Sequence, residues 1–158
     1  MVFGLVFFAA AFAPAVTVHG DWGVINRGGR CDALAASVLR PANNRARAIA
    51  GFAFVRTGSP WGRFQSRLSR LPRPGASAVL KIGNEAFLLD RRGDVAWSRN
   101  PRQDQAILSA VRAGGTMRLD SRDGAGRRFT DTFSLAGAPT AIDAAAALCA
   151  SRASGQSR

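Results

Sequence analysis

The chain has 158 residues, about the size of one domain, and 47% of them are hydrophobic, which excludes a disordered chain. Its net charge is +12, carried by 21 arginines and a single lysine that are spread along the chain. Dispersed positive charge suits an anionic partner, and it equally suits a solvated basic surface without a dedicated ligand. Composition therefore leaves the partner open.

The first twenty residues resemble a secretory signal peptide. Residues 2–12 form an apolar run that is too short to span a bilayer, and Ala13-Pro14-Ala15 places small residues where a signal peptidase reads them. We expect cleavage after Ala15 or Gly20, a periplasmic or secreted mature protein, and no transmembrane helix in it. No Lys or Arg precedes the apolar run, so a buried N-terminal strand or helix is the alternative.

The two cysteines, Cys31 and Cys149, lie near the two ends of the presumed mature chain. An even number of distant cysteines in an exported chain predicts one structural disulfide. There is no CxxC pair, and the single histidine, His19, lies at or before the cleavage point. We therefore expect no metal site, no cofactor, and neither a catalytic cysteine nor a Ser/His/Asp set.

The next feature is a series of short strands with turn signals between them. Gly83-Asn84 is a hairpin signal, and Leu71-Pro-Arg-Pro-Gly75 marks an exposed connection. Further turns are predicted at 26–29, 90–93 and 121–126. Strands are expected at 21–25, 48–56, 61–68, 78–82, 85–89, 95–98, 116–120 and 127–135, whereas 31–39 fits either a strand or one helical turn.

Two segments change to a helical period. Residues 101–113 carry Ala106, Ile107, Ala110 and Val111 on one stripe, and Gly114-Gly115 ends it. Residues 139–150 form a closing helix with Ala141, Ala145 and Leu148, or a face close to it, on the core. The expected fold is mainly β, an antiparallel sandwich or barrel-like domain over 21–150 with two short helices, followed by a flexible tail at 151–158.

Arginine and aromatic residues raise the question of a ligand surface. Arg63, Arg67, Arg70 and Arg73 crowd one region and are the candidate anion-binding residues. Three tryptophans and most of the ten phenylalanines alternate with other apolar residues as core side chains do. We therefore assign them to the core rather than to base stacking, and expect no specific nucleic-acid ligand. Asp120 and Asp123 flank a turn, but acid–base catalysis would need a cleft between them.

Two segments of the C-terminal half carry a family resemblance: residues 106–119 (AILSAVRAGGTMRL) and 132–142 (TFSLAGAPTAI). Together with Gly20-Asp-Trp-Gly-Val24 and the downstream Cys31, they resemble the invasion-associated locus B family of exported Gram-negative proteins. The resemblance implies a periplasmic or surface-associated β-sandwich without catalytic residues to carry over. The chain departs from the family pattern by having Ala138 in place of phenylalanine and by lacking a mid-chain cysteine pair.

Three functional hypotheses follow. The first is an exported, non-enzymatic protein that acts by binding an anionic envelope component or another envelope protein, or in a structural role. The second is a binding module for lipopolysaccharide, phospholipid or an acidic protein through an arginine-rich surface. The third is an enzyme that uses carboxylates alone, which would require two facing carboxylates in a cleft.

Overall fold

The computed structural model describes residues 16–43 and 45–151. Within them, ten antiparallel strands form one sheet in the order β1-β2-β3-β4-β5-β8-β7-β6-β9-β10. The strands are β1 (Val16–His19), β2 (Trp22–Arg27), β3 (Arg30–Ala36), β4 (Ile49–Val55), β5 (Trp61–Arg67), β6 (Ala78–Ile82), β7 (Glu85–Arg92), β8 (Val95–Trp97), β9 (Thr116–Arg122) and β10 (Arg128–Ser134). With two helices, this confirms the predicted mainly β, sandwich-like class. The predicted signal segment lies largely outside the described residues, and so do residues 152–158.

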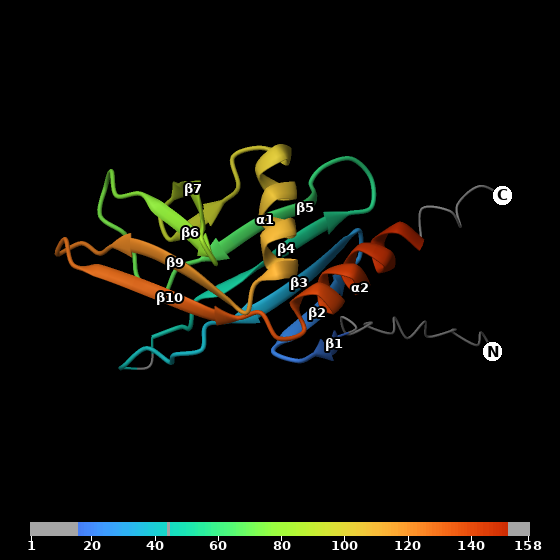
Figure 1. The fold of residues 1–158 in the computed structure, drawn as a ribbon, viewed down its shortest axis with the longest axis horizontal. Helices are drawn as coiled ribbons and strands as arrows, with labels where there is room; N and C mark the ends of the chain where they lie inside the picture. The colour runs from blue at the N-terminus through green and yellow to red at the C-terminus, as the bar shows by residue number, and fades with distance from the viewer. Residues whose placement is uncertain (1–15, 44, 152–158) are drawn as a thin grey trace, which may run out of the picture.

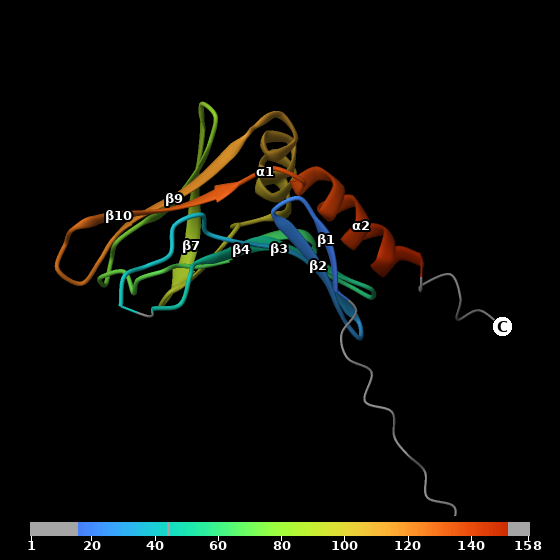
Figure 2. The ribbon, with the colours of Figure 1, turned by 90° about the horizontal axis from the view of Figure 1, so that it is seen from below.

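Strand β7 folds the sheet into two facing layers (Figures 1 and 2). Its first part pairs with β6, with Glu85 opposite Ile82 and Leu89 opposite Ala78. Its last part pairs instead with β8, with Asp90 opposite Trp97. Because β7 belongs to both layers, the sheet stays continuous while its two layers close over a common core.

Large aromatic side chains fill the space between the layers. Trp22 and Phe52 stack with ring centroids 6.2 Å apart, and Phe64 meets Phe52 edge-on at 5.5 Å. The Trp22 indole Nε1 donates to the carbonyl of Ser134 at 2.9 Å, which joins β2 to the end of β10. The predicted core role is confirmed for these residues, but Trp61 is 46% exposed because it lies at the end of β5.

Helix α1 (Pro101–Ala113) begins at the N-cap Asn100, whose side chain accepts from the Gln103 amide, and ends at Gly114. It buries Ile107, Ala110 and Val111, most of the predicted stripe. Buried Asp104 accepts hydrogen bonds from the Phe64 amide and the Ser98 hydroxyl. That carboxylate therefore ties the first turn of the helix to β5 and to the residue after β8.

Helix α2 (Ala138–Ser151) lies against β2 and β3. Its buried stripe has helical spacing, and its members are Ala138, Ala141, Ile142, Ala145 and Cys149. Leu148, predicted for the same face, is only partly buried, and Cys149 takes the buried position beside it. The predicted disulfide is present: Cys149 is bonded to Cys31 of β3, 118 residues away in sequence.

The joint between β10 and α2 touches the β1–β2 turn backbone to backbone. The Asp21 amide donates to the carbonyl of Ala136 at 3.0 Å. Gly137 has a φ of +84°, and a Cβ added there would lie 2.0 Å from the carbonyl oxygen of His19. Gly137 is therefore required both for its left-handed backbone and for this close approach.

Two predicted turns begin later than expected. Residues 90–92 belong to β7, and the turn starts at Gly93, because these residues pair with β8. Likewise Ser121 and Arg122 remain in β9 opposite Phe129 and Arg128, so the hairpin turn starts at Asp123. In both places, pairing with a neighbouring strand overrides the local preference of polar residues for turns.

Candidate functional site

One end of the molecule carries three adjoining hollows of about 410, 510 and 570 Å³. They lie where the β9–β10 hairpin meets residues 38–43 and 45–47, which follow β3, and residues 69–76, which follow β5 (Figures 1 and 2). The first and third hollows share Arg45, Ser69 and Arg70. We call this region the basic surface. Its cations are Arg40, Arg45, Arg70, Arg73, Lys81, Arg122, Arg127 and Arg128.

Arg70 holds the centre of the basic surface. Its guanidinium carbon lies 5.7 Å from the ring centroid of Phe129 in β10, and its Nη1 lies 3.1 Å from Oδ2 of Asp123. Phe129 is only 7% exposed, so its ring serves as a support for the cation. Arg70 is thus held between a ring and a carboxylate.

Asp123 organises the turn of the β9–β10 hairpin. Its Oδ1 accepts hydrogen bonds from the backbone amides of Ala125 and Arg127, both at 3.0 Å. Burial alone would raise the pKa of Asp123, but the amides of Arg127 and Ala125 and the Arg70 side chain outweigh it and hold that pKa below its usual range. The carboxylate is therefore charged at neutral pH and already has its partners.

Residues 69–73 are anchored to the same hairpin. The Ser69 amide donates to Oδ2 of buried Asp131 at 2.9 Å, and the Arg73 amide donates to the carbonyl of Arg122 at 3.0 Å. Between them, Pro72 forms an isolated β-bridge with Asp123. This connection, predicted from its prolines to be exposed, therefore has a fixed path across the surface.

The basic surface has more cations than its acids can neutralise. Its linings contain eight cations and three carboxylates, a difference of five positive charges. The carboxylates already have partners. Asp120, for example, forms an ion pair with Lys81 at 2.8 Å and accepts a hydrogen bond from the Thr130 hydroxyl at 2.7 Å. Among the residues that the structure describes, Arg40, Arg45 and Arg128 have no carboxylate partner.

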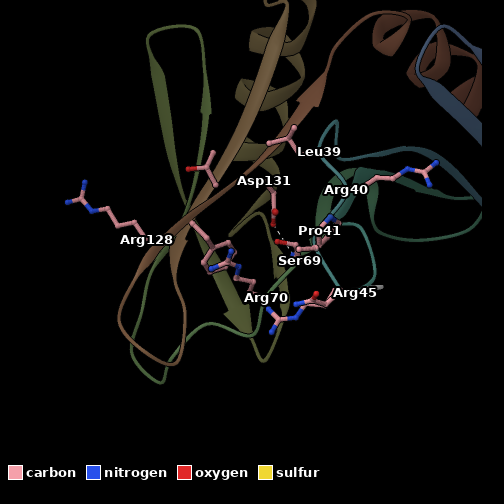
Figure 3. A pocket seen from close by; sticks show the side chains of 12 residues that line it. Leu39, Arg40, Pro41, Arg45, Ser69, Arg70, Arg128 and Asp131 are labelled. Atoms are coloured by element: carbon pink, nitrogen blue, oxygen red, sulfur yellow. Dashed lines mark hydrogen bonds between the residues drawn. The ribbon is translucent and has the colours of Figure 1, made fainter.

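The unpaired guanidinium groups do not converge on one point. Figure 3 shows Arg128 extending to one side of the first hollow, Arg40 to the other and Arg45 toward the bottom of the view. A small anion in a single cradle would need donors aimed at one centre. The arrangement instead spreads positive charge over a broad area.

The structure does not gather the four predicted anion-binding arginines. Arg63 lines a separate hollow of about 390 Å³ beside Trp61, and Arg67 lies 3.8 Å from Asp94. Both are in β5, and only Arg70 and Arg73, which follow that strand, reach the basic surface. Arg63 lies four residues before the end of β5, about 13 Å back along the strand, and Arg67 lies beside Asp94 instead.

Sequence reasoning missed Arg40, Arg45 and Arg128. They come from the loop after β3 and from β10, up to 88 positions apart, and only the antiparallel closure brings them together. The contact is direct: the Val38 amide donates to the carbonyl of Thr132 at 2.7 Å. The adjacent Arg127-Arg128 pair was the one local signal available.

The two carboxylates considered for acid–base chemistry do not face each other. Asp120 lines the second hollow and Asp123 the third, and each is bonded to a cation. Within residues 16–43 and 45–151, no three His, Cys, Asp or Glu side chains cluster in a way that could hold a metal ion. None of the described helices combines the length and apolar character needed to cross a membrane.

Comparison with known proteins supports the fold. No family model matches the sequence, and no curated protein sequence does either. The crystal structure of invasion associated protein b from Bartonella henselae is similar, with a TM-score of 0.62 and 15% sequence identity, over 85% of this chain and 97% of that chain. The order of strands and helices described above is therefore that of a known architecture: this chain has the fold of invasion associated protein B.

Proposed function

We propose that this protein is an exported, non-enzymatic protein of the invasion-associated locus B type that binds an anionic component of the cell envelope through the basic surface. One observation carries the proposal: the basic surface has a surplus of five positive charges, and its carboxylates already have partners. Because these guanidinium groups are unpaired, an anionic ligand could bind them without first breaking an ion pair.

Two features support export. The disulfide between Cys31 and Cys149 is of a kind that persists in oxidising compartments. The apolar run at residues 2–12 and the small residues at 13 and 15 match a signal peptide. The likeness to invasion associated protein b extends over nearly all of that chain, which fits a shared overall architecture.

The non-enzymatic part of the proposal rests on how the acidic residues are used. Asp104 is hydrogen-bonded to the Phe64 amide and the Ser98 hydroxyl, and Asp131 to the Ser69 amide. These carboxylates hold elements together, as Asp123 holds its turn. A carboxylate-only enzyme would instead need one acid and one base facing a shared cleft.

The experiment compares two triple variants with the same net charge. Arg40, Arg45 and Arg128 are changed to Gln in one, and Arg27, Arg92 and Arg102, which line none of the hollows described above, in the other. Binding to lipopolysaccharide is measured between about 50 and 200 mM salt. We expect the first variant to lose about a hundredfold in affinity, since each of the three surface cations contributes about 1 kcal/mol.

The control triple should lose much less, and binding by the parent protein should weaken steeply with salt. Equal losses in the two triples would show that only net charge matters, and would contradict a dedicated surface. Salt-insensitive binding would contradict the electrostatic mechanism. A turnover reaction abolished by a single carboxylate substitution would contradict the non-enzymatic assignment.

A further inference from the structure

We infer, building on the proposed function, that the anionic component is a lipid bilayer and that Leu39 and Leu71 enter it when the basic surface docks. The end formed by the β9–β10 hairpin and the two neighbouring loops then faces the membrane.

Leu39 and Leu71 are among the most exposed large apolar side chains of the described residues, at 71% and 66%. Leu39 lines the first hollow and Leu71 the third, and these two hollows share Arg45, Ser69 and Arg70. The leucines thus border the same basic centre. Burying a leucine side chain releases about 1.5–3 kcal/mol, so a partner with an apolar layer beneath its charges would gain from both.

The backbone beside each leucine is fixed. The Val38 amide bonds to Thr132 in β10, and the Ser37 hydroxyl donates to the carbonyl of Leu39 at 3.2 Å. Arg47 donates from its side chain to the carbonyl of Ser37. Pro72, beside Leu71, is bridged to the β9–β10 hairpin. The two leucines are therefore presented on supported backbone, which lowers the entropy cost of docking.

The spread of the arginines fits an extended anionic plane better than a single phosphate. Arg40, Arg45 and Arg128 point apart in Figure 3, and a head-group layer offers negative charge at each of those places. Long arginine side chains can also keep their charged ends at the head groups while neighbouring apolar side chains go deeper. Separated cations around apolar residues are typical of peripheral membrane binding.

A nucleic acid or a polysaccharide would use this surface less well. Stacking on bases needs an exposed ring, but Phe129 is buried and its face is covered by Arg70. Neither polymer offers an apolar layer, so Leu39 and Leu71 would stay in water. These partners are therefore alternative outcomes of the test rather than part of the proposal.

The test measures co-sedimentation of the full chain with phosphatidylcholine vesicles that contain phosphatidylglycerol. We expect binding to these vesicles and little to pure phosphatidylcholine. The variant with Leu39→Ser and Leu71→Ser should lose at least about tenfold in vesicle affinity, since two apolar side chains no longer insert. The matched control is Ile49→Ser with Leu88→Ser, two exposed residues outside the basic surface, and it should bind like the parent.

Insertion has a direct readout in a Leu39→Trp variant. Vesicles whose lipids carry bromine on the acyl chains should quench the added tryptophan strongly, after subtraction of the parent signal from Trp22, Trp61 and Trp97. A Leu88→Trp variant should not be quenched. Absence of quenching at Leu39, or unchanged vesicle binding after the two leucine-to-serine substitutions, would overturn the inference.

Deacylated lipopolysaccharide separates failure of this inference from failure of the proposed function. This soluble anion retains phosphate groups but has no acyl chains. If it binds with the same dependence on Arg40, Arg45 and Arg128 while vesicles do not bind, the proposed function stands and the bilayer inference falls. If neither vesicles nor lipopolysaccharide in either form bind, both fall.

Discussion

At the residue scale, Gly137 makes the sharpest prediction. A methyl group at this position would meet the carbonyl oxygen of His19 at 2.0 Å, and the backbone there has a φ of +84°. Gly137→Ala should lower the free energy of unfolding by about 3 kcal/mol or more, because the β1–β2 turn must move away from the β10–α2 joint. Urea unfolding followed by circular dichroism measures this loss.

Gly93 supplies the control for backbone conformation. It also has a positive φ, +60°, but nothing lies within 4 Å of an added Cβ. Gly93→Ala should therefore cost only the left-handed conformation, about 1–2 kcal/mol. Similar losses at Gly93 and Gly137 would mean that the close contact with His19 does not matter to stability.

The sequence carried only half of the information about this glycine. Gly137 and Pro139 indicate a joint between strand and helix, and the structure confirms that joint. The contact with His19, 118 positions earlier, depends on how β1 and β2 pack against the end of β10. No local pattern reports such an approach, because it arises only when distant elements meet.

At the element scale, the disulfide between Cys31 of β3 and Cys149 of α2 should contribute strongly to the free energy of unfolding. Changing Cys31 and Cys149 to Ala should lower the free energy of unfolding by about 4–5 kcal/mol, because the unfolded chain would lose a cross-link over 118 residues. Urea unfolding of oxidised and reduced parent protein provides a control without truncated side chains. Identical midpoints for the two forms would contradict the prediction.

Elements were predictable where period and turn chemistry agree. The Gly83-Asn84 hairpin and the helix at Pro101–Ala113 follow from local signals, and both are present. The predicted turn at Asp90 was wrong because β7 changes partner there, from β6 to β8. A change of partner within one strand leaves no mark in hydrophobic alternation, because the strand stays extended and paired on both sides of the point where the partner changes.

At the scale of the whole molecule, we propose from the pairing of β1 that cleavage follows Ala15 rather than Gly20. Val16 to His19 pair with Ile25 to Trp22, and Gly20 packs against the carbonyl of Ala136. Cleavage after Gly20 would remove this strand, whereas cleavage after Ala15 would keep it. We expect N-terminal sequencing of the exported protein to begin at Val16. A start at Asp21 would contradict that site, and a cytoplasmic pool retaining Met1 would contradict export.

The candidate site shows where sequence reasoning ends. A charge of +12 predicts a positive surface but not its place. Arg40, Arg70 and Arg128 border one hollow only because the loop after β3, the connection after β5 and strand β10 meet at the same end of the folded sheet. Arg63 and Arg67, close to Arg70 in sequence, lie elsewhere: the extended strand β5 places Arg63 far from its end, and Arg67 lies beside Asp94.

The described chain begins and ends on the side of the molecule opposite the β9–β10 turn (Figures 1 and 2). Val16 opens β1 and Ser151 closes α2, and these two elements contact each other. A protein that approaches a charged plane with its hairpin end would therefore hold both of these ends toward the bulk solvent. Reporter domains fused at either end would therefore project away from the plane. Their distance from the plane would be set by the long axis of the molecule.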